Sequence, residues 1–367
     1  MKNICFIVSN IDKALAFEWL ALHFKDKCNL HFLLLNQGET QLSAFLTKEQ
    51  IAHQTIQYRG KKDLPLALVK TMQYLLKNNI KLVHTHLFDA NIIGLLAAKM
   101  VGIKNRIHTR HHATYHHEYF PKAVRYDKFI NSLSTQIVAI SENVKEVLIN
   151  KEGVKADKIK LIHHGFDLNS FETGEGKEIL QKKYNKSNKR PVIGVISRYL
   201  ELKGIHYIIP AFKKLLETYP NALLILANAK GDYTHVIKNQ LTTLPAYSYL
   251  EIPFEENIQA LYHLFDIFVH VPINLKVEAY GQTFVEALAA NVPSVFTMSG
   301  IAPEYIIHQK NALVVDYKND TQIYDAFIEL LTNENLRNQL VVTGNNDVKQ
   351  MFDLQIMLNK LSAIYFN

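Results

Sequence analysis

The chain has 367 residues, of which 48% are apolar, and a formal net charge of +7 at pH 7. This length is sufficient for two hydrophobic cores and predicts two domains. The two cysteines, Cys5 and Cys28, exclude a disulfide scaffold and favour a reducing compartment.

The apolar stretches of the sequence are too short for a secretory leader or a membrane span. Residues 4–9 are apolar, but polar residues follow at once, so we expect a first buried strand there. The longest candidate span, residues 91–103, is interrupted by Lys99, and no stretch reaches the ~18 apolar residues that a membrane helix needs. We therefore expect a soluble, cytoplasmic protein.

Short runs rich in β-branched residues alternate with helix-periodic segments in the first part of the chain, which is typical of a parallel sheet. The predicted strands are residues 4–9, 30–35, 54–58, 81–86, 106–111, 136–140 and 160–164. The predicted helices are residues 12–23, 65–77, 90–101 and 142–149. Asp12 and Ser141 are the expected N-caps. The polar segment 171–190 is expected to be a linker with one helix near 178–184.

The alternating pattern restarts at residue 191. The predicted strands are residues 191–197, 222–227, 247–252, 267–271 and 293–296, and the predicted helices are 205–216, 235–241, 258–265 and 283–290. Segments 302–308, 312–315 and 320–331 complete the series before a largely helical tail. We therefore predict two doubly wound α/β domains, residues 1–170 and 191–351, facing each other across a cleft where ligands bind at the carboxyl ends of the strands.

The positive charge is concentrated in the first part of the chain. Residues 1–168 hold 23 Lys and Arg against 14 Asp and Glu, a net +9, whereas the remainder has a net charge of −2. This basic part would face either an anionic membrane surface or an acidic glycan, or would be a solvated face without a partner. Nucleic-acid binding is not expected, because no basic run is interleaved with aromatic residues in a recognisable module.

Two carboxylates, Glu278 and Glu286, flank a glycine at the start of a predicted helix. The N-terminus of a helix offers unpaired N–H groups and the positive end of a dipole, which suit phosphate. Gly281 would let a ligand approach the backbone closely. Together these residues suggest a site for a ligand with hydroxyls and phosphates, such as a nucleotide sugar.

Several motifs, in a consistent order, resemble those of the retaining glycosyltransferases of family 4, which have the GT-B fold. The motifs are the E-x7-E element 278–286, the segment 197–205 similar to G-R-x-x-x-x-K-G, the runs 299–304 and 311–315, and the turns 140–142 and 162–167. The resemblance implies two Rossmann-like domains and a C-terminal helix, about residues 352–367, that packs back on the first domain.

The resemblance also implies roles for individual residues. Arg198 and Lys203 would hold the donor diphosphate, and cations there stabilise the negative charge that develops on the leaving group. Glu286 would accept hydrogen bonds from the ribose, and Glu278 would lie near the transferred sugar. His111 would reach the donor from the first domain. The further donor ligands would be Gly281, Gln282, Thr283, Phe284 and Glu304.

Some positions depart from the family pattern. Residues 10–13 replace the glycine-rich loop that follows the first strand, so the acceptor stays undetermined. The family's Gly-x-Gly after Ala227 is changed to residues 228–231, and the glycine before the base pocket is missing around 252–254, so the nucleotide base stays undetermined. The histidine-rich segment 108–117 permits a metal site as an alternative. No metal and no other cofactor is expected, because the histidine spacing suits no common ligand pattern and the family's transfer needs no divalent ion.

We therefore expect a retaining transferase that moves a sugar from a nucleotide diphosphate donor to an acceptor hydroxyl. The acceptor would be a glycan or a lipid-linked saccharide in polysaccharide biosynthesis, by analogy with the family, and the protein would be cytoplasmic or peripheral at the inner face of the membrane. Two alternatives remain: a sugar-nucleotide 2-epimerase of the same fold, and a non-catalytic subunit that binds nucleotide sugar.

Overall fold

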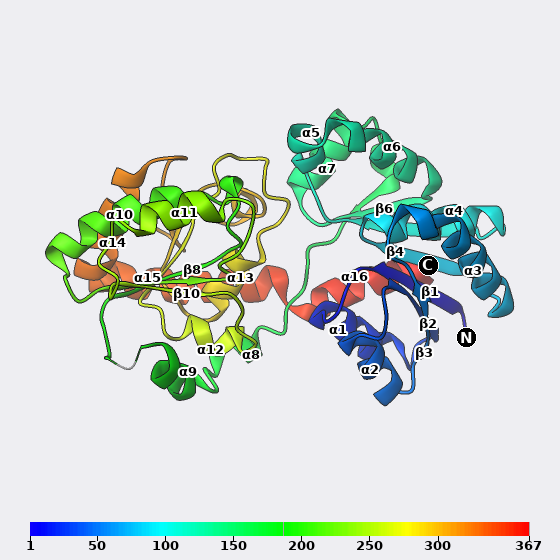
Figure 1. Ribbon diagram of the computed structural model, residues 1–367. Helices are drawn as coiled ribbons and strands as arrows, with labels where there is room; N and C mark the ends of the chain where they lie inside the picture. Colours follow the sequence, from blue (N-terminus) through cyan, green and yellow to red (C-terminus); the bar gives the residue numbers. More distant parts are fainter. Residues whose placement is uncertain (186, 367) are drawn as a thin grey trace. The chain divides into compact units, whose positions relative to one another are not determined.

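The computed structural model describes residues 1–185 and 187–366 and divides the chain into two compact units. The first unit comprises Met1–Gly165 and the chain from Gln355 on, and the second comprises Phe166–Leu354. Each unit is a parallel sheet covered by helices (Figure 1). The predicted α/β class is therefore confirmed.

The first unit contains a seven-stranded parallel sheet in the order β3-β2-β1-β4-β5-β6-β7. Its strands are β1 (Asn3–Ser9), β2 (Asn29–Asn36), β3 (Ala52–Gln57), β4 (Leu82–His86), β5 (Asn105–Arg110), β6 (Gln136–Ala139) and β7 (Ile159–Leu161). Its helices are α1 (Leu15–Phe24), α2 (Gln41–Lys48), α3 (Leu64–Lys77), α4 (Phe88–Met100), α5 (Tyr115–Tyr119), α6 (Val124–Leu133), α7 (Glu142–Asn150) and α16 (Leu354–Phe366), with 3-10 turns η1 (Lys61–Asp63), η2 (Pro121–Ala123) and η3 (Ala156–Lys158).

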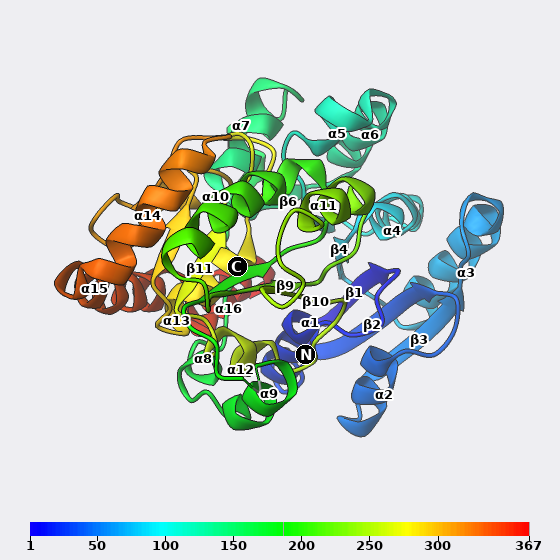
Figure 2. The ribbon, with the colours of Figure 1, turned by 60° about the vertical axis from the view of Figure 1, so that its left-hand side comes forward.

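The second unit contains a six-stranded parallel sheet in the order β10-β9-β8-β11-β12-β13. Its strands are β8 (Val192–Ile196), β9 (Leu223–Ala227), β10 (Tyr249–Ile252), β11 (Ile267–His270), β12 (Ser294–Phe296) and β13 (Leu313–Val314). Its helices are α8 (Asn169–Glu172), α9 (Lys177–Tyr184), α10 (Ile205–Thr218), α11 (Thr234–Leu241), α12 (Ile258–Tyr262), α13 (Gln282–Ala289), α14 (Asp320–Thr332) and α15 (Glu334–Phe352), with 3-10 turns η4 (Glu201–Lys203) and η5 (Ala302–Glu304). Helices α10, α11 and α14 cover one face of this sheet, and α8, α12 and α13 cover the other (Figure 2).

Strands β4, β8, β9 and β11 are buried along their whole length, as is expected when helices cover both faces of a parallel sheet. All five residues of β8 are buried, and α10 packs its apolar stripe on that sheet through Ile208 and Phe212. In each sheet the strand order reverses once, between β1 and β4 in the first and between β8 and β11 in the second. Ligands of open α/β sheets bind beside such a reversal, at the carboxyl ends of the strands.

The C-terminal helix α16 packs against the first sheet, as the resemblance implied. The Tyr365 hydroxyl lies 2.5 Å from His84 Nδ1, and the Tyr365 ring lies 5.1 Å from that of Phe24. His84 Nε2 lies 2.8 Å from the Thr109 hydroxyl, so both ring nitrogens of this buried histidine have partners. Burial lowers the pKa of His84 to about 3, with smaller contributions from His108 and neighbouring histidines, so its ring is neutral in this core.

The ends of some helices differ from the sequence expectations because tertiary contacts determine them. Ser141 is confirmed as the N-cap of α7, since its hydroxyl accepts a hydrogen bond from Val144 N at 3.2 Å. Asp12 does not cap α1; its carboxylate accepts two hydrogen bonds from Gln41 at the start of α2. The helix expected near 178–184 is α9 (Lys177–Tyr184). It belongs to the second unit, in which Phe171 and Leu180 are buried.

Candidate active site

The loop that follows β8 carries two of the predicted site residues. Arg198 lies two residues beyond the strand and its side chain is exposed, and Lys203 ends the turn η4. Gly204, with φ of +71°, connects η4 to α10. A Cβ at this position would overlap the carbonyl oxygen of Val271, directly after β11. Glycine therefore permits the close approach that brings Lys203 to the carboxyl end of β11.

Lys203 forms an ion pair with Glu278, the first carboxylate of the E-x7-E element. Both side chains are largely buried, at 16% and 14% exposure. His270, the last residue of β11, places its Nε2 atom 3.6 Å from the same carboxylate oxygen. Burial opposes ionisation of Glu278, but the Lys203 charge and His270 outweigh it and hold the pKa of Glu278 well below its usual range. Glu278 is therefore an anion that is held in place and is a weak base.

Helix α13 begins immediately beyond this ion pair. Its N-cap is Gly281, in the left-handed region with φ of +81°, and no side chain caps the helix. A Cβ at position 281 would lie 2.6 Å from the Phe284 ring, so only glycine fits this turn without a shift. The backbone N–H groups from Gly281 to Phe284 are those that the sequence assigned to the donor, and of these the Phe284 N–H donates to the Gly281 carbonyl oxygen at 3.0 Å. An uncapped helix start with this geometry suits an anion.

Glu286 lies one turn into α13. The Tyr262 hydroxyl of α12 donates a hydrogen bond to its Oε2 atom at 2.8 Å. Burial raises the pKa of Glu286 to about 7, against the opposing effect of the Tyr262 hydrogen bond. The carboxyl group therefore changes charge close to neutral pH.

Replacing Glu286 with glutamine is expected to raise the melting temperature of the ligand-free protein more at pH 8 than at pH 5. The folded-state pKa of about 7 lies above the ordinary value of 4.5. Between these values the unfolded chain releases its proton before the folded chain does, so ionisation of Glu286 increasingly favours unfolding as the pH rises. Glutamine carries no such proton.

Melting curves of both proteins between pH 5 and pH 8 measure this difference. The matched control is Glu334→Gln at the start of α15, because the Glu334 side chain is 76% exposed. A stabilisation by Glu286→Gln that does not change with pH would contradict a raised pKa at this position.

The segment after β12 packs against Glu278 and Tyr280. A Cβ at Gly300, which has φ of +60°, would lie 2.5 Å from the Tyr280 carbonyl oxygen and 2.9 Å from Glu278 Cγ. Ile301 N donates a hydrogen bond to the Tyr280 carbonyl oxygen at 2.9 Å, and the turn η5 that follows ends at Glu304. Burial raises the pKa of the Tyr280 phenol, with further contributions from Tyr305, Glu304 and Glu286. The structure thus brings Lys203, Glu278, the start of α13, Glu286 and Glu304 together at the carboxyl ends of the second sheet. Arg198 lies on the same loop as Lys203, and within the part of the chain that is described its guanidinium has no side-chain partner.

Sequence reasoning missed the residues that support this site. His270 was expected only as part of a strand, although its place eight residues before Glu278 at a strand end is a readable signal. Tyr262 was expected only as a helix residue, and nothing in the sequence connects it to Glu286. Their contacts with Glu278 and Glu286 depend on the tertiary fold of the second unit.

His111, predicted to contribute from the first domain, follows β5 in the first unit. Its Nε2 atom lies 3.2 Å from His86 Nδ1, and its ring stacks on His164 with centroids 5.5 Å apart. Burial holds the pKa of His111 well below its usual range, with the neighbouring histidines adding to the effect. His111 is therefore a neutral imidazole held in a fixed orientation, and its contact with the donor stays a prediction.

A network of buried charges lies beside His111. Arg110, which is 2% exposed, forms ion pairs with Asp127 of α6 at 3.1 Å and with Glu152, just beyond α7, at 2.6 Å. His112 and His116 lie 3.2 and 2.7 Å from the Asp127 carboxylate. The ligand atoms of these two histidines and Asp127 lie within 4.8 Å of one another, which is close enough for them to share a metal ion. The Arg110 guanidinium lies 3.1 Å from the Asp127 carboxylate, and its positive charge would repel a metal cation bound there.

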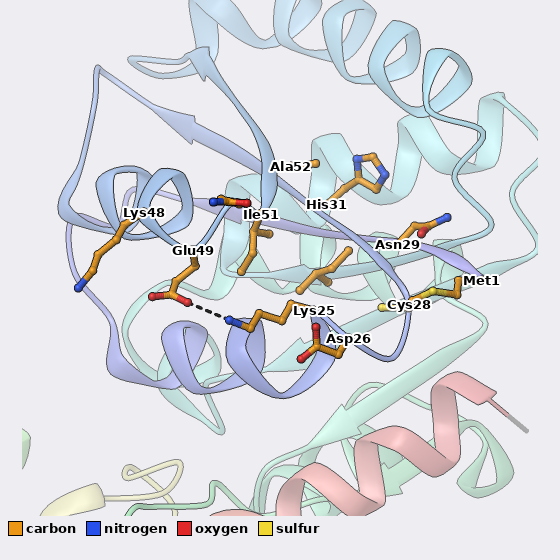
Figure 3. A pocket seen from close by; sticks show the side chains of 12 residues that line it. Met1, Lys25, Asp26, Cys28, Asn29, His31, Lys48, Glu49, Ile51 and Ala52 are labelled. Atoms are coloured by element: carbon orange, nitrogen blue, oxygen red, sulfur yellow. Dashed lines mark hydrogen bonds and ion pairs between the residues drawn. The ribbon is translucent and has the colours of Figure 1, made fainter.

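A polar pocket of about 730 Å³ lies elsewhere in the first unit (Figure 3). Its lining includes Asn29, where β2 begins, and Ala52, where β3 begins. Lys25 and Glu49, which also line it, form an ion pair at 2.9 Å. The pocket therefore lies at the amino ends of these strands, at the opposite edge of the first sheet from the edge where such sheets bind ligands.

Comparison with known proteins agrees with this geometry. Residues 28–170 match the family model described as Glycosyltransferase Family 4, and residues 176–347 match the model described as Glycosyl transferases group 1. The chain belongs to the family 4 glycosyltransferases. The predicted family and the predicted GT-B fold are thereby confirmed.

Individual relatives of this glycosyltransferase are distant but match along most of their length. The capsular polysaccharide biosynthesis glycosyltransferase CapM of Staphylococcus aureus is 24% identical, covering 100% of this chain and 97% of the relative. The N-acetyl-alpha-D-glucosaminyl L-malate synthase of Bacillus anthracis is 24% identical over 83% of this chain and 79% of its own. Anabaena HepE, solved in complex with UDP-glucose, has a TM-score of 0.84 at 19% identity and covers 99% of each chain.

No helix within residues 1–185 and 187–366 combines the length and the apolar character needed to cross a membrane.

Proposed function

We propose that this glycosyltransferase moves a sugar from a nucleotide diphosphate donor to an acceptor hydroxyl with retention of the anomeric configuration. The observation that carries the proposal is the ion pair between Lys203 and Glu278 beside the uncapped start of α13, at the strand-order reversal of the second sheet. In this arrangement cations and N–H groups can bind phosphates, and carboxylates can accept hydrogen bonds from hydroxyls. HepE, which shares the fold, was solved with UDP-glucose.

In this proposal the second unit binds the donor. Arg198 and Lys203 hold the diphosphate and stabilise its charge as the glycosidic bond breaks, which lowers the transition state more than the ground state. These cations supply the charge that a divalent ion supplies in other transferases, so we propose transfer without a metal cofactor. Ionised Glu286 accepts hydrogen bonds from the ribose, and Glu304 contacts the sugar.

The state of Glu278 favours a positioning role over a nucleophilic one. Its carboxylate is held by Lys203 and His270, and its lowered pKa makes it a poor base and a poor nucleophile. The acceptor proton would then pass to the departing phosphate oxygen, on the same face as the leaving group, which gives retention. Glu278 fixes the Lys203 ammonium beside that face.

The acceptor and the location rest on two separate observations. CapM is named for capsular polysaccharide biosynthesis, and the basic part of this chain suits an anionic surface. We therefore propose a glycan or lipid-linked acceptor in cell-surface polysaccharide assembly, with the protein in the cytoplasm or peripheral at the inner face of the membrane.

The test is the anomeric configuration of the product. The protein is incubated with α-linked UDP-, GDP- and ADP-sugars and with saccharide acceptors, both water-soluble and lipid-linked, and the new linkage is assigned by NMR. An α-linked product is expected, and a β-linked product would overturn retention. Conversion of the donor to an epimer without any acceptor would identify an epimerase. Donor binding without transfer to any acceptor would identify a binding subunit.

A further inference from the structure

The first unit has an apolar pocket of about 610 Å³ at the carboxyl edge of its sheet, and none of the residues assigned to the donor lines it. Tyr58, directly after β3, and Phe88 and Asp89, at the start of α4 after β4, line one side. The segment from α5 to α6 supplies the other side. Asn10, directly after β1, donates a hydrogen bond to Asp89 at 3.1 Å. The pocket therefore lies beside the strand-order reversal between β1 and β4, where such a sheet binds ligands.

The lining of the pocket is mainly hydrocarbon. Leu64, Phe88 and Ile92 contribute buried or half-buried side chains, and the remaining apolar members are Tyr119, Phe120, Pro121, Ala123 and Tyr126. The carboxylate of Asp89 is engaged, because the Tyr58 hydroxyl donates to its Oδ1 atom at 3.2 Å and Asn10 to its Oδ2 atom. A water-soluble saccharide would find few hydrogen-bonding groups in this pocket.

Three aromatic side chains at the pocket remain exposed: Tyr119 at 40%, Phe120 at 53% and Tyr126 at 50%. Phe129 on α6, at 42%, and Leu66 on α3, at 57%, extend the exposed apolar surface on these two helices. Exposed apolar side chains that gather around a concave site mark a binding surface. Tyrosine rings in particular favour the boundary between hydrocarbon and water.

The charges near the pocket are mainly positive. Lys61 and Lys122 line it. Further exposed cations lie on the same segments at Arg59, Lys62, Lys70, Arg125 and Lys128. Four carboxylates lie on these segments: Asp127 is buried in the Arg110 network, Asp89 is engaged by Tyr58 and Asn10, Asp63 accepts a hydrogen bond from Arg59 N at 2.7 Å, and Glu118 on α5 is exposed. The cations on the same segments outnumber these carboxylates. An anionic group on an apolar ligand would therefore be attracted to the rim.

We propose that this pocket binds the hydrocarbon chain of a lipid-linked acceptor, with the phosphate of that lipid at Lys61 and Lys122. The inference rests on the proposed function, because it names the acceptor class of that transfer. Apolar lining alone would suit any hydrophobic ligand, and the lysines alone would suit any anion. The two together, at the strand-order reversal of the first sheet, select an amphipathic molecule with an anionic head.

The experiment measures binding by calorimetry with the full chain. The probes are dodecyl phosphate below its micelle concentration, inorganic phosphate, and dodecyl maltoside as an uncharged chain. Dodecyl phosphate is expected to bind at least about tenfold more tightly than either other probe. The double variants Phe120→Ser with Tyr126→Ser and Lys61→Gln with Lys122→Gln are each expected to weaken it by about tenfold or more.

The controls are Ile179→Ser and Lys238→Gln in the second unit, where both side chains are exposed; neither is expected to change binding of dodecyl phosphate. Equal affinity for inorganic phosphate, or unchanged affinity in both double variants, would overturn the proposal. Binding to phosphatidylglycerol vesicles without binding of dodecyl phosphate would show a membrane-contact surface instead and would also overturn it. UDP, GDP and ADP are titrated in parallel, because failure of every nucleotide would count against the proposed transfer and not against this pocket.

Discussion

Replacing Lys203 with alanine is expected to lower the turnover of sugar transfer by about a hundredfold or more and also to destabilise the protein. The kinetic loss follows from removing one cation from the leaving group, which typically costs about 3 kcal/mol of barrier. The loss of stability has a different cause. Glu278, at 14% exposure, would lose its counter-ion. Breaking such a buried pair costs about 3 kcal/mol, and the cost should be somewhat smaller here because His270 stays beside the Glu278 carboxylate.

Arg198→Ala is the matched comparison. Its guanidinium is exposed, so we expect a similar kinetic loss with a change in unfolding free energy below about 0.5 kcal/mol. Turnover at saturating donor and urea unfolding at pH 7 separate the two effects. Near-normal turnover in both folded variants would show that Arg198 and Lys203 do not stabilise the donor diphosphate. Equal losses of stability in the two variants would contradict the ion pair between Lys203 and Glu278.

Replacing Arg110 with methionine is expected to destabilise the first unit by about 3–5 kcal/mol, the usual cost of leaving buried charges without their partner. Asp127 and Glu152 both have 0% side-chain exposure, and Arg110 is the cation between them. Burial opposes ionisation of Asp127, but hydrogen bonds from His112 and His116 and the Arg110 charge hold its pKa well below its usual range. Methionine fills similar space without compensating either carboxylate.

Urea unfolding measures this loss, and Lys145→Met is its control. Lys145 pairs with Glu142 at 3.0 Å on the surface of α7, with 35% and 44% exposure, so its loss should cost less than about 1 kcal/mol. Adding Asp127→Asn and Glu152→Gln to Arg110→Met should recover part of the stability, because the uncompensated charges are removed. Similar costs for Arg110→Met and Lys145→Met would contradict the buried network.

The fold was predictable where a local pattern decides the structure. The buried strands β1, β4, β8 and β9 are short apolar or β-branched runs, and the hydroxyl of Ser141 has a local partner in the first turn of α7. Helices α2, α5 and α6 were not predicted. The first two are short. Helix α6 holds two buried polar residues, Asp127, which pairs with Arg110, and Asn131, which donates a hydrogen bond to Glu152, and neither contact is visible in the sequence.

Some residues of the candidate site could be predicted from the sequence, but their partners could not. The E-x7-E spacing and the glycine between the carboxylates could be read directly, because Gly281 is required by its φ and by the Phe284 ring. The partners of these residues could not be read, since the Lys203 to Glu278 pair joins residues 75 positions apart. The raised pKa of Glu286 likewise depends on burial that only the folded unit provides.

Calorimetric titration of nucleoside diphosphates tests the central claim most directly, because it asks whether this loop and helix hold a donor diphosphate. UDP, GDP and ADP are titrated into the unaltered protein, Lys203→Ala and Glu286→Gln at pH 8, where Glu286 is ionised. The account predicts that at least one of the three binds the unaltered protein and binds both variants at least about tenfold more weakly. Binding that is unchanged in both folded variants, or no binding of any of the three, would contradict it.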